Sequence, residues 1–372
     1  MTSKERMMRA LRREEPDRLP CTVHQWQRYH LDEYLGGVGE LEAFQRFGLD
    51  AALQYFESTG QSWVYGEEGS DRAAPDWMVE VEVLDHTSEA LRRQYRVRTP
   101  SGSLSYRTEG NCRTTWITEH LVKHKEDIDL VARHMPVPKV NRESVQRAYD
   151  QLGDAGILRG FVWGDQAGCW QHACCLFGMQ EMILAALDDP SWAHRFLRIL
   201  CDKKLQFVEE SLVGASFDLI ETGGGAGSST VISPAMHREF CLPHDREVHH
   251  ALHRTGHLVA YHTCGGMMPL AEMIAGNGAD ATETMAPRGV GGDVDAAELK
   301  RKVGDRLCLI GGMDQFNVLT RGTDREIRAE VQRLFAAAGA GGGYILSCAD
   351  HFFDTPPANL QAYAHAAREC VY

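Results

Sequence analysis

The feature that most constrains the fold is a regular alternation of short apolar segments with helical stretches in the second half of the chain. Six candidate strands follow residue 155, at positions 157–165, 217–225, 257–266, 279–285, 306–314 and 343–350. Strands that alternate with helices predict βαβ units and a parallel sheet, because each helix carries the chain back to the start of the next strand. Two earlier apolar runs, at 19–24 and 50–56, complete a set of eight strands.

Eight βα units in a chain of 372 residues predict a (β/α)8 barrel, the TIM-barrel architecture. A doubly wound open sheet is the alternative, but its G-x-G-x-x-G turn does not follow the first strands. Residues 3–13 have the spacing of an amphipathic helix, which we expect as an N-terminal extension. The sequence has no low-complexity linker, so we expect a single barrel domain over residues 1–372.

The segment from about 77 to 115 has a different pattern. WMVEVEVL (77–84) and LRRQYRVR (91–98) alternate apolar and polar residues, and TPSG (99–102) is a turn sequence. Strict alternation is typical of half-exposed antiparallel strands. We therefore predict an antiparallel β-hairpin or meander, inserted into the barrel.

The charge balance and the cysteine count restrict the setting of the protein. With 39 basic and 52 acidic side chains the net charge is −13, which argues against a nucleic-acid or anionic membrane surface as partner. The N-terminal residues lack an apolar signal segment, and no apolar run has the length of a membrane span, so we expect a cytoplasmic protein. Eleven cysteines in a reducing compartment serve packing, metal ligation or catalysis rather than a disulfide framework.

Almost every predicted strand ends on a polar side chain. In a barrel of this type the active site lies at the carboxyl ends of the strands. The side chains there are His24, Glu57, Asp165, Glu221, His262, Cys264, Glu283, Asp314, Cys348 and Asp350. We expect the catalytic carboxylates to be Glu221, Glu283, Asp314 and Asp165. The alternative for each of them is that it caps the helix that follows.

The segment Tyr261–Gly266 (YHTCGG) has the best-defined chemistry. Side chains two residues apart on a strand point to the same side, so His262 and Cys264 can converge on one ion. Cys348 ends the last strand, next to the first in a closed barrel, and supplies a third soft ligand. One imidazole and two thiolates suit Zn²⁺ and leave an open position for catalysis. The alternative is that all three are buried packing residues.

Three further clusters carry weaker signals. The stretch CWQHACC (169–175) could hold a second metal ion, but we expect its cysteines to pack, and the histidine-rich run 244–253 is expected to be a helix with a solvated face. The glycine-rich segment 223–227 lacks a P-loop lysine and is expected to face a substrate instead. The residues that we expect against a cofactor are His24, Gly223, Gly224 and Gly265.

Several segments together give the chain a family resemblance. They are KERMMRALRREEPDRLP (4–20), SPAMHREFCLP (233–243), YHTCGG (261–266), GGMDQFNVLTRGT (311–323) and GGGYILSCADHFFDTPPANLQAY (341–363). In these segments the chain resembles the uroporphyrinogen decarboxylase superfamily, whose members fold as (β/α)8 barrels. Its decarboxylases bind a substrate with many carboxylates through an arginine-rich motif after the first strand. Here that place reads CTVHQWQRYH, with Arg28 as its single arginine.

The resemblance is greater to the second branch of the superfamily, the corrinoid-dependent methyltransferases such as methylcobamide:coenzyme M methyltransferases. Their H-x-C…C zinc pattern is matched by His262, Cys264 and Cys348. The resemblance implies a cytoplasmic zinc methyltransferase that exchanges a methyl group between a corrinoid (cobalamin) and a small thiol or methylated substrate. The corrinoid is free or carried by a separate corrinoid protein. Two alternatives stay open: a decarboxylase-like lyase, and a non-catalytic zinc protein that binds a corrinoid or another small ligand.

Overall fold

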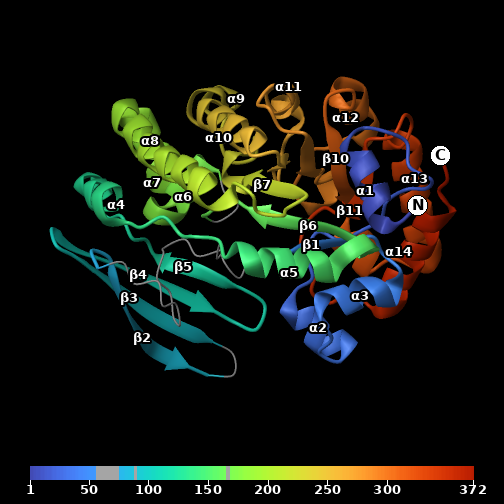
Figure 1. The fold of residues 1–372 in the computed structure, drawn as a ribbon, viewed down its shortest axis with the longest axis horizontal. Helices are drawn as coiled ribbons and strands as arrows, with labels where there is room; N and C mark the ends of the chain where they lie inside the picture. Colours follow the sequence, from blue (N-terminus) through green and yellow to red (C-terminus); the bar gives the residue numbers. More distant parts are fainter. Residues whose placement is uncertain (56–74, 88–89, 165–167) are drawn as a thin grey trace.

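The core of the protein is a curled parallel sheet of seven strands (Figure 1). The computed structural model describes residues 1–55, 75–87, 90–164 and 168–372. The strand order β1-β6-β7-β8-β9-β10-β11 follows the chain, apart from an insertion between β1 and β6. The strands are β1 (Ala51–Gln54), β6 (Gly156–Phe161), β7 (Leu219–Gly223), β8 (Leu258–His262), β9 (Ala281–Thr284), β10 (Cys308–Met313) and β11 (Tyr344–Cys348).

The segment at residues 20–22 joins the two edges of this sheet. The Thr22 amide donates to the Leu346 carbonyl on β11 and the Leu346 amide donates to the Pro20 carbonyl, both at 2.9 Å. On the other side the Asp50 amide, next to β1, donates to the Cys21 carbonyl at 2.8 Å. The segment thus takes the place of the eighth strand and closes the barrel. It is shorter than the predicted strand at 19–24, partly because Pro20 has no amide hydrogen for a ladder.

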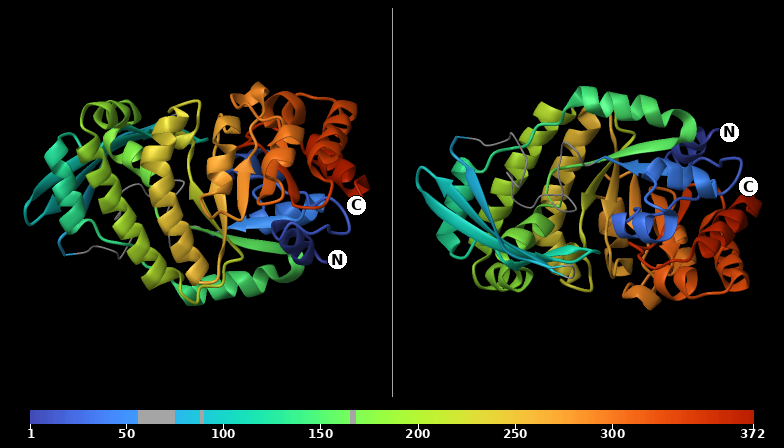
Figure 2. Two further views of the ribbon diagram at one scale, coloured as in Figure 1. Left: turned by 90° about the horizontal axis from the view of Figure 1, so that it is seen from above. Right: turned by 90° about the horizontal axis from the view of Figure 1, so that it is seen from below.

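Helices surround the sheet, as the two views in Figure 2 show. They are α2 (Arg28–Leu35), α3 (Glu40–Phe47), α4 (Ile128–His134), α5 (Arg142–Leu152), α6 (Cys169–Phe177), α7 (Met179–Asp188), α8 (Pro190–Phe207), α9 (Pro234–Met236), α10 (Leu242–Arg254), α11 (Ala271–Ala275), α12 (Ala296–Val303), α13 (Asp324–Ala338) and α14 (Pro357–Glu369). The alternation of strands and helices confirms the predicted barrel class.

Helix α13 illustrates how the sequence sets these elements. Thr323 and Glu326 form a reciprocal capping box at its start, and the helix ends at Gly339. Its buried side chains recur at helical spacing, as Ile327, Val331, Leu334 and Ala338. That apolar stripe lies against β10 and β11, while the charged residues between these positions face solvent.

An N-terminal helix, α1 (Ser3–Leu11), closes one end of the barrel. Its buried Met7, Ala10 and Leu11 pack in one cluster with the residues that line the barrel at the starts of its strands. These lining residues include Ala52, Ile157, Leu219, Ala281, Cys308 and Ile345. The predicted helical extension is therefore confirmed, and it covers the amino ends of the strands. The carboxyl ends lie at the opposite end of the barrel.

The insertion is a four-stranded antiparallel sheet that lies to one side of the barrel, away from α13 and α14 (Figure 1). Its strands are β2 (Met78–His86), β3 (Leu91–Thr99), β4 (Gly102–Gly110) and β5 (Thr115–Glu119). The predicted hairpin is thus part of a larger meander. Stacked Tyr95 and Tyr106 rings, 4.2 Å apart, join β3 to β4. None of the helices within the described residues is both long and apolar enough to cross a bilayer.

Candidate active site

Four charged or titratable side chains enter the barrel from four neighbouring strands. Arg159, Glu221, His262 and Glu283 lie on β6, β7, β8 and β9, and each is almost fully buried. Each follows, by two positions, a residue that lines the barrel interior, namely Ile157, Leu219, Ala260 and Ala281. Because side chains alternate along a strand, all four point inward. The sheet thus brings the predicted Glu221, His262 and Glu283 together near the carboxyl ends of their strands.

Arg159 joins the two glutamates. Its Nη2 lies 2.8 Å from Glu221 Oε2 and 2.8 Å from both carboxylate oxygens of Glu283. The three side chains are at most 4% exposed. Buried charges are tolerated when they are paired and hydrogen-bonded in this way. The contacts with Arg159 therefore offset the cost of burying the two carboxyl groups in one site.

The pKa values of the two glutamates are shifted in opposite directions. Burial, followed by the nearby Glu283 charge, raises the pKa of Glu221 to about 8. Burial acts on Glu283 in the same sense, but Arg159 and the hydrogen bond from His262 outweigh it and hold the pKa of Glu283 well below its usual range. Near neutral pH one carboxyl therefore carries a proton and the other is an anion. The catalytic roles of both residues stay predictions.

His262 is oriented by Glu283. Its Nδ1 lies 3.1 Å from Glu283 Oε1 and donates to this carboxylate. Nothing among the described residues hydrogen-bonds its buried Nε2. Burial alone would lower the pKa of His262, but the adjacent Cys264 thiol and the two glutamates raise it. A carboxylate on one ring nitrogen, with the other nitrogen left available, is the arrangement that metal-binding histidines adopt.

A second group of donors meets the first at His24. The His24 ring centre is 5.3 Å from that of His262 and 5.2 Å from that of His351. Within the described residues, two sets of three donors have atoms that all lie within 4.8 Å of one another. These sets are His24 with His262 and Glu283, and His24 with Asp350 and His351. Burial, together with the neighbouring imidazoles, lowers the pKa of His24 to about 3, so its ring is neutral and able to ligate.

The three predicted zinc ligands are distributed over two faces of the barrel wall. Cys264 lies beside the His262 ring. Like Cys264, Cys348 belongs to neither three-residue set. It lies an odd number of positions after the barrel-lining Ile345, so its side chain points outward, and burial raises the pKa of its thiol to about 12. The role of these residues in metal binding stays a prediction.

Asp314, a third predicted catalytic carboxylate, belongs to neither three-residue set. Asp314 caps the π-helical turn Gln315–Thr320: its Oδ1 accepts from the amides of Phe316 at 3.1 Å and Asn317 at 2.8 Å. This is the capping use that was the alternative to catalysis. Asp165 lies outside the described residues. The catalytic roles of both stay predictions.

The predicted cofactor-facing glycines lie where the chain packs closely. Gly223 and Gly224 have φ of +91° and +145°. A Cβ on Gly223 would lie 2.5 Å from the His262 carbonyl oxygen, and a Cβ on Gly265 would lie 2.8 Å from Ser228 Oγ. Only glycine combines these conformations with such short approaches. The structure therefore gives these residues a packing role, and cofactor binding stays a prediction for them.

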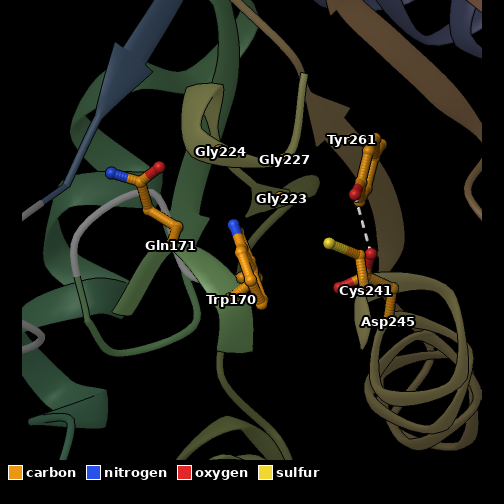
Figure 3. A pocket seen from close by; sticks show the side chains of 9 residues that line it. Trp170, Gln171, Gly223, Gly224, Gly227, Cys241, Asp245 and Tyr261 are labelled. Carbon is orange, nitrogen blue, oxygen red and sulfur yellow. Dashed lines mark hydrogen bonds between the residues drawn. The ribbon is translucent and has the colours of Figure 1, made fainter. Parts of the chain in front are cut away.

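Figure 3 shows Gly223 and Gly224 on the rim of a small pocket. The pocket is lined by Gly168, Trp170, Gln171, Gly227, Cys241, Asp245 and Tyr261 as well. Tyr261 immediately precedes the inward-facing His262, so it points outward and donates to Asp245 Oδ2 at 2.7 Å. The pocket therefore lies behind the barrel wall, between β8 and α10, and is separate from the histidine and carboxylate cluster.

Sequence reasoning missed Arg159 and His351. Arg159 is a charge in an apolar run, and that is the only signal the sequence offers for it. The cysteine-rich stretch in α6 packs as expected, with Cys169, His172 and Cys174 buried. The histidine-rich run forms helix α10, in which His244 and His249 are buried and the other histidines lie nearer the surface.

Comparisons with known proteins agree with this architecture. A family model described as uroporphyrinogen decarboxylase (URO-D) matches residues 109–370. The uroporphyrinogen decarboxylase of Chromohalobacter salexigens is 24% identical over 390 residues, which cover 98% of this chain and 97% of the relative. The enzyme of that name from Psychromonas ingrahamii is 27% identical over 192 residues, which cover 50% of each chain, so this chain spans about half the length of that relative in the match.

Among solved structures, a methyltransferase from Methanosarcina mazei matches with a TM-score of 0.69. The match covers 99% of both chains at 17% sequence identity. A likeness at this identity supports the fold, and it extends over the insertion as well as the barrel. Activity has to be argued from the site itself.

Proposed function

Because this chain belongs to the uroporphyrinogen decarboxylase family, we propose that it is a metal-dependent methyltransferase of that family. It exchanges a methyl group between a corrinoid and a small thiol or a methylated substrate. The observation that carries the proposal is the buried Nε2 of His262, which has no hydrogen-bond partner among the described residues while Glu283 orients the ring from the other side. A solved protein of the same fold is described as a methyltransferase, so a barrel of this kind can carry the chemistry.

His262 and Cys264 would hold a zinc ion at this position. An unpaired imidazole nitrogen beside a thiol is a donor pair that suits Zn²⁺. When bound, zinc lowers the pKa of a substrate thiol or polarises the oxygen or sulfur of a methylated substrate. A thiolate ligand keeps the net charge of the centre low, which favours a nucleophilic substrate thiolate.

The neighbouring side chains would orient this centre. Glu283 holds the His262 ring through Nδ1, and Arg159 holds Glu283 through both carboxylate oxygens. Glu221 Oε1 also lies 3.6 Å from His262 Nδ1. Three strands thus fix one imidazole, so that a bound substrate would meet a rigid centre. The corrinoid is free or delivered by a separate corrinoid protein, and the substrate is a small molecule in a cytoplasmic setting.

Decarboxylation, the activity in the names of the sequence relatives, fits this site less well. A substrate with many carboxylates requires free cationic side chains. Arg28, the arginine after the first strand, is exposed and paired with Asp32 on α2. Arg159 enters the barrel, but it is paired with Glu221 and with the Glu283 carboxylate and is therefore not free for a substrate. Among the described groups around His262 and His24, the carboxylates of Glu283 and Asp350 would repel a polyanion.

The test is methyl exchange by the zinc-loaded protein. Methylcobalamin with a panel of small thiols, and cob(I)alamin with methylated thiols and ethers, are followed by the absorbance of the cobalt centre. We expect exchange with at least one partner, and its loss in His262→Ala. A decarboxylase would be active without zinc and indifferent to Cys264→Ser. Absence of exchange with every partner at full zinc occupancy would contradict the proposal.

A further inference from the structure

A group of three donors lies at the open end of the barrel, where β11 ends. His24, Asp350 and His351 each offer one ligand atom, and these three atoms all lie within 4.8 Å of one another. The group consists of two imidazoles and one carboxylate, and none of its members comes from β6, β7, β8 or β9. It therefore shares no side chain with His262 and Cys264, and methyl transfer at that pair leaves it without a role.

His24 reaches this group from the segment that closes the barrel. Cys21 pairs with Leu346 in that segment, and the side chains of Cys21 and Val23 both belong to the outer core. His24 therefore points into the barrel by alternation. The residue is buried, and no side chain or backbone group in the described part of the chain hydrogen-bonds its ring nitrogens. A ring nitrogen of His24 is thus available to an ion.

Asp350 and His351 face His24 from the end of β11. The His351 and Asp350 side chains are 35% and 37% exposed, so solvent reaches both of them. His351 Nε2 lies 3.8 Å from Asp350 Oδ1, and the ring centre of His351 is 5.2 Å from that of His24. Bonds of about 2.1 Å to one ion place its ligand atoms about 3.0–3.5 Å apart. Side-chain rotations that move each donor by about 0.5–1 Å close the difference.

Two outer contacts orient these donors. The Gln27 carboxamide lies 2.8 Å from His351 Nδ1. With its oxygen turned toward an Nδ1–H, Gln27 fixes the tautomer in which Nε2 offers a lone pair to an ion. Asp350 Oδ1 accepts from the His351 amide at 2.7 Å, which sets the plane of the carboxylate. Metal ligands in proteins are held by outer hydrogen bonds of this kind.

His24 also belongs to the set with His262 and Glu283. In that set both Glu283 oxygens already contact Arg159, and Oε1 also accepts from His262 Nδ1. A carboxylate engaged in this way is a poor ligand, whereas Asp350 is not paired with an arginine or a lysine among the described residues. His24 is therefore better placed to ligate with Asp350 and His351.

We propose that His24, Asp350 and His351 bind a divalent transition-metal ion of their own, separate from the zinc ion at His262 and Cys264. Two imidazoles and one carboxylate are a donor set that first-row ions such as Fe²⁺, Co²⁺ and Zn²⁺ accept. Three protein ligands leave coordination positions open toward solvent, where an oxygen donor of a small substrate can bind. The site goes beyond the proposed methyl transfer, which requires only the first ion.

The experiment titrates the metal-free full chain with Co²⁺, and equilibrium dialysis counts the bound ions. We expect two equivalents, one with the intense charge-transfer absorption of a thiolate ligand and one with weak visible bands alone, because the second site has no thiolate. His24→Ala and His351→Ala should each weaken the thiolate-free equivalent at least about 100-fold and leave the other unchanged. Cys264→Ser should remove the thiolate absorption and leave the thiolate-free equivalent.

A matched control removes a histidine from a simple histidine–aspartate pair. His253 Nε2 lies 2.9 Å from Asp280 Oδ2 on the surface, and neither residue belongs to a three-donor set. We expect His253→Ala to leave both Co²⁺ equivalents unchanged. Circular dichroism verifies that each variant is folded. Asp350→Asn and His351→Ala change partly exposed side chains, so they keep the test decisive where His24→Ala does not fold.

The outcomes separate this inference from the proposed function. An unmodified protein without a thiolate-free equivalent, or one whose thiolate-free equivalent persists in Asp350→Asn and His351→Ala, would overturn the inference and leave methyl transfer standing. Loss of both equivalents in His24→Ala would show one shared centre and would also overturn the inference. A thiolate-free equivalent that is lost in His351→Ala, in a protein that exchanges no methyl group, would overturn the proposed function alone.

Discussion

Replacement of Arg159 by methionine is expected to destabilise the protein more than any surface change of the same kind. The Arg159 guanidinium makes contacts of 2.8 Å with Glu221 and Glu283 while only 3% of its side chain is exposed. At an effective dielectric constant of about 20, unit charges at this separation attract each other by about 6 kcal/mol. Part of this attraction offsets the cost of burying the arginine, and removal of one partner of a buried pair costs about 3–5 kcal/mol.

The expected loss lies near the lower end of that range. Glu221 has a pKa raised to about 8 and already carries a proton near pH 7, so loss of the arginine does not leave it as a buried anion. Glu283 keeps the hydrogen bond from His262 Nδ1. We therefore expect Arg159→Met to lower the free energy of unfolding by about 3 kcal/mol. Urea unfolding of the metal-free protein, followed by circular dichroism at pH 7, measures it without interference from a bound ion.

Two further variants make the result interpretable. Arg98→Met breaks a pair of similar length, 3.0 Å to Glu80, in which the side chains are 65% and 46% exposed. It should cost less than about 1 kcal/mol. Glu283→Gln combined with Arg159→Met removes the unpaired anion and should recover part of the loss. If Arg159→Met costs no more than Arg98→Met, the idea that the buried arginine is what allows the carboxylates to share the barrel is refuted.

Three other changes test separate parts of the structure. Gly311→Ala places a Cβ 1.9 Å from the Thr284 carbonyl oxygen, whereas the Cβ of Gly36→Ala meets nothing within 4 Å. Gly311→Ala should lower the free energy of unfolding by more than about 3 kcal/mol, and Gly36→Ala should lower it by about 1 kcal/mol. Equal losses in the two variants would contradict the close approach at Gly311. Thr323→Ala removes a capping hydrogen bond and should lower the free energy of unfolding, measured in urea, by about 1 kcal/mol. Thr323→Ser keeps a capping hydroxyl and should lose much less. Burial raises the pKa of Asp245 to about 7 in the folded protein, above its unfolded value of 3.8, so stability should fall by up to about 4 kcal/mol as pH rises from 4 to 7. Asp245→Asn should remove that fall in stability. If the pH profile of the variant is unchanged, the fall comes from the other groups around this carboxyl. These groups are Tyr261 on β8, Cys241 and His244 at α10, and Cys201 and Lys204 on α8.

Strand alternation predicts which side chains share a face on one strand, but it does not relate residues on different strands whose register is unknown. Cys264 lies beside His262 although β8 ends at His262 and Cys264 follows the strand. Cys348 lies on another strand, and a shift of one residue along that strand reverses the face of every side chain. The sequence shows a strand near 343–350 but not which of its residues line the barrel.

Arg159 was beyond prediction for a different reason. Its partners Glu221 and Glu283 lie 62 and 124 residues away along the chain. A lone charge in an apolar strand indicates a buried partner without identifying it. The barrel class was more accessible, because eight alternating units leave few arrangements. The number of strands in the insertion was harder to predict, because β5 has only five residues and little apolar alternation.

The segment that closes the barrel also sets the order in which the protein can be completed. Pro20 and Thr22 form backbone hydrogen bonds with Leu346, which the ribosome adds more than three hundred residues later. At about 5–20 residues per second, the first segment waits tens of seconds on the ribosome for its partner strand. His24 is carried by that early segment and Asp350 follows the late strand. The contact between these two side chains therefore forms only once the ring has closed, so the carboxyl end of the barrel is completed in the last step of folding.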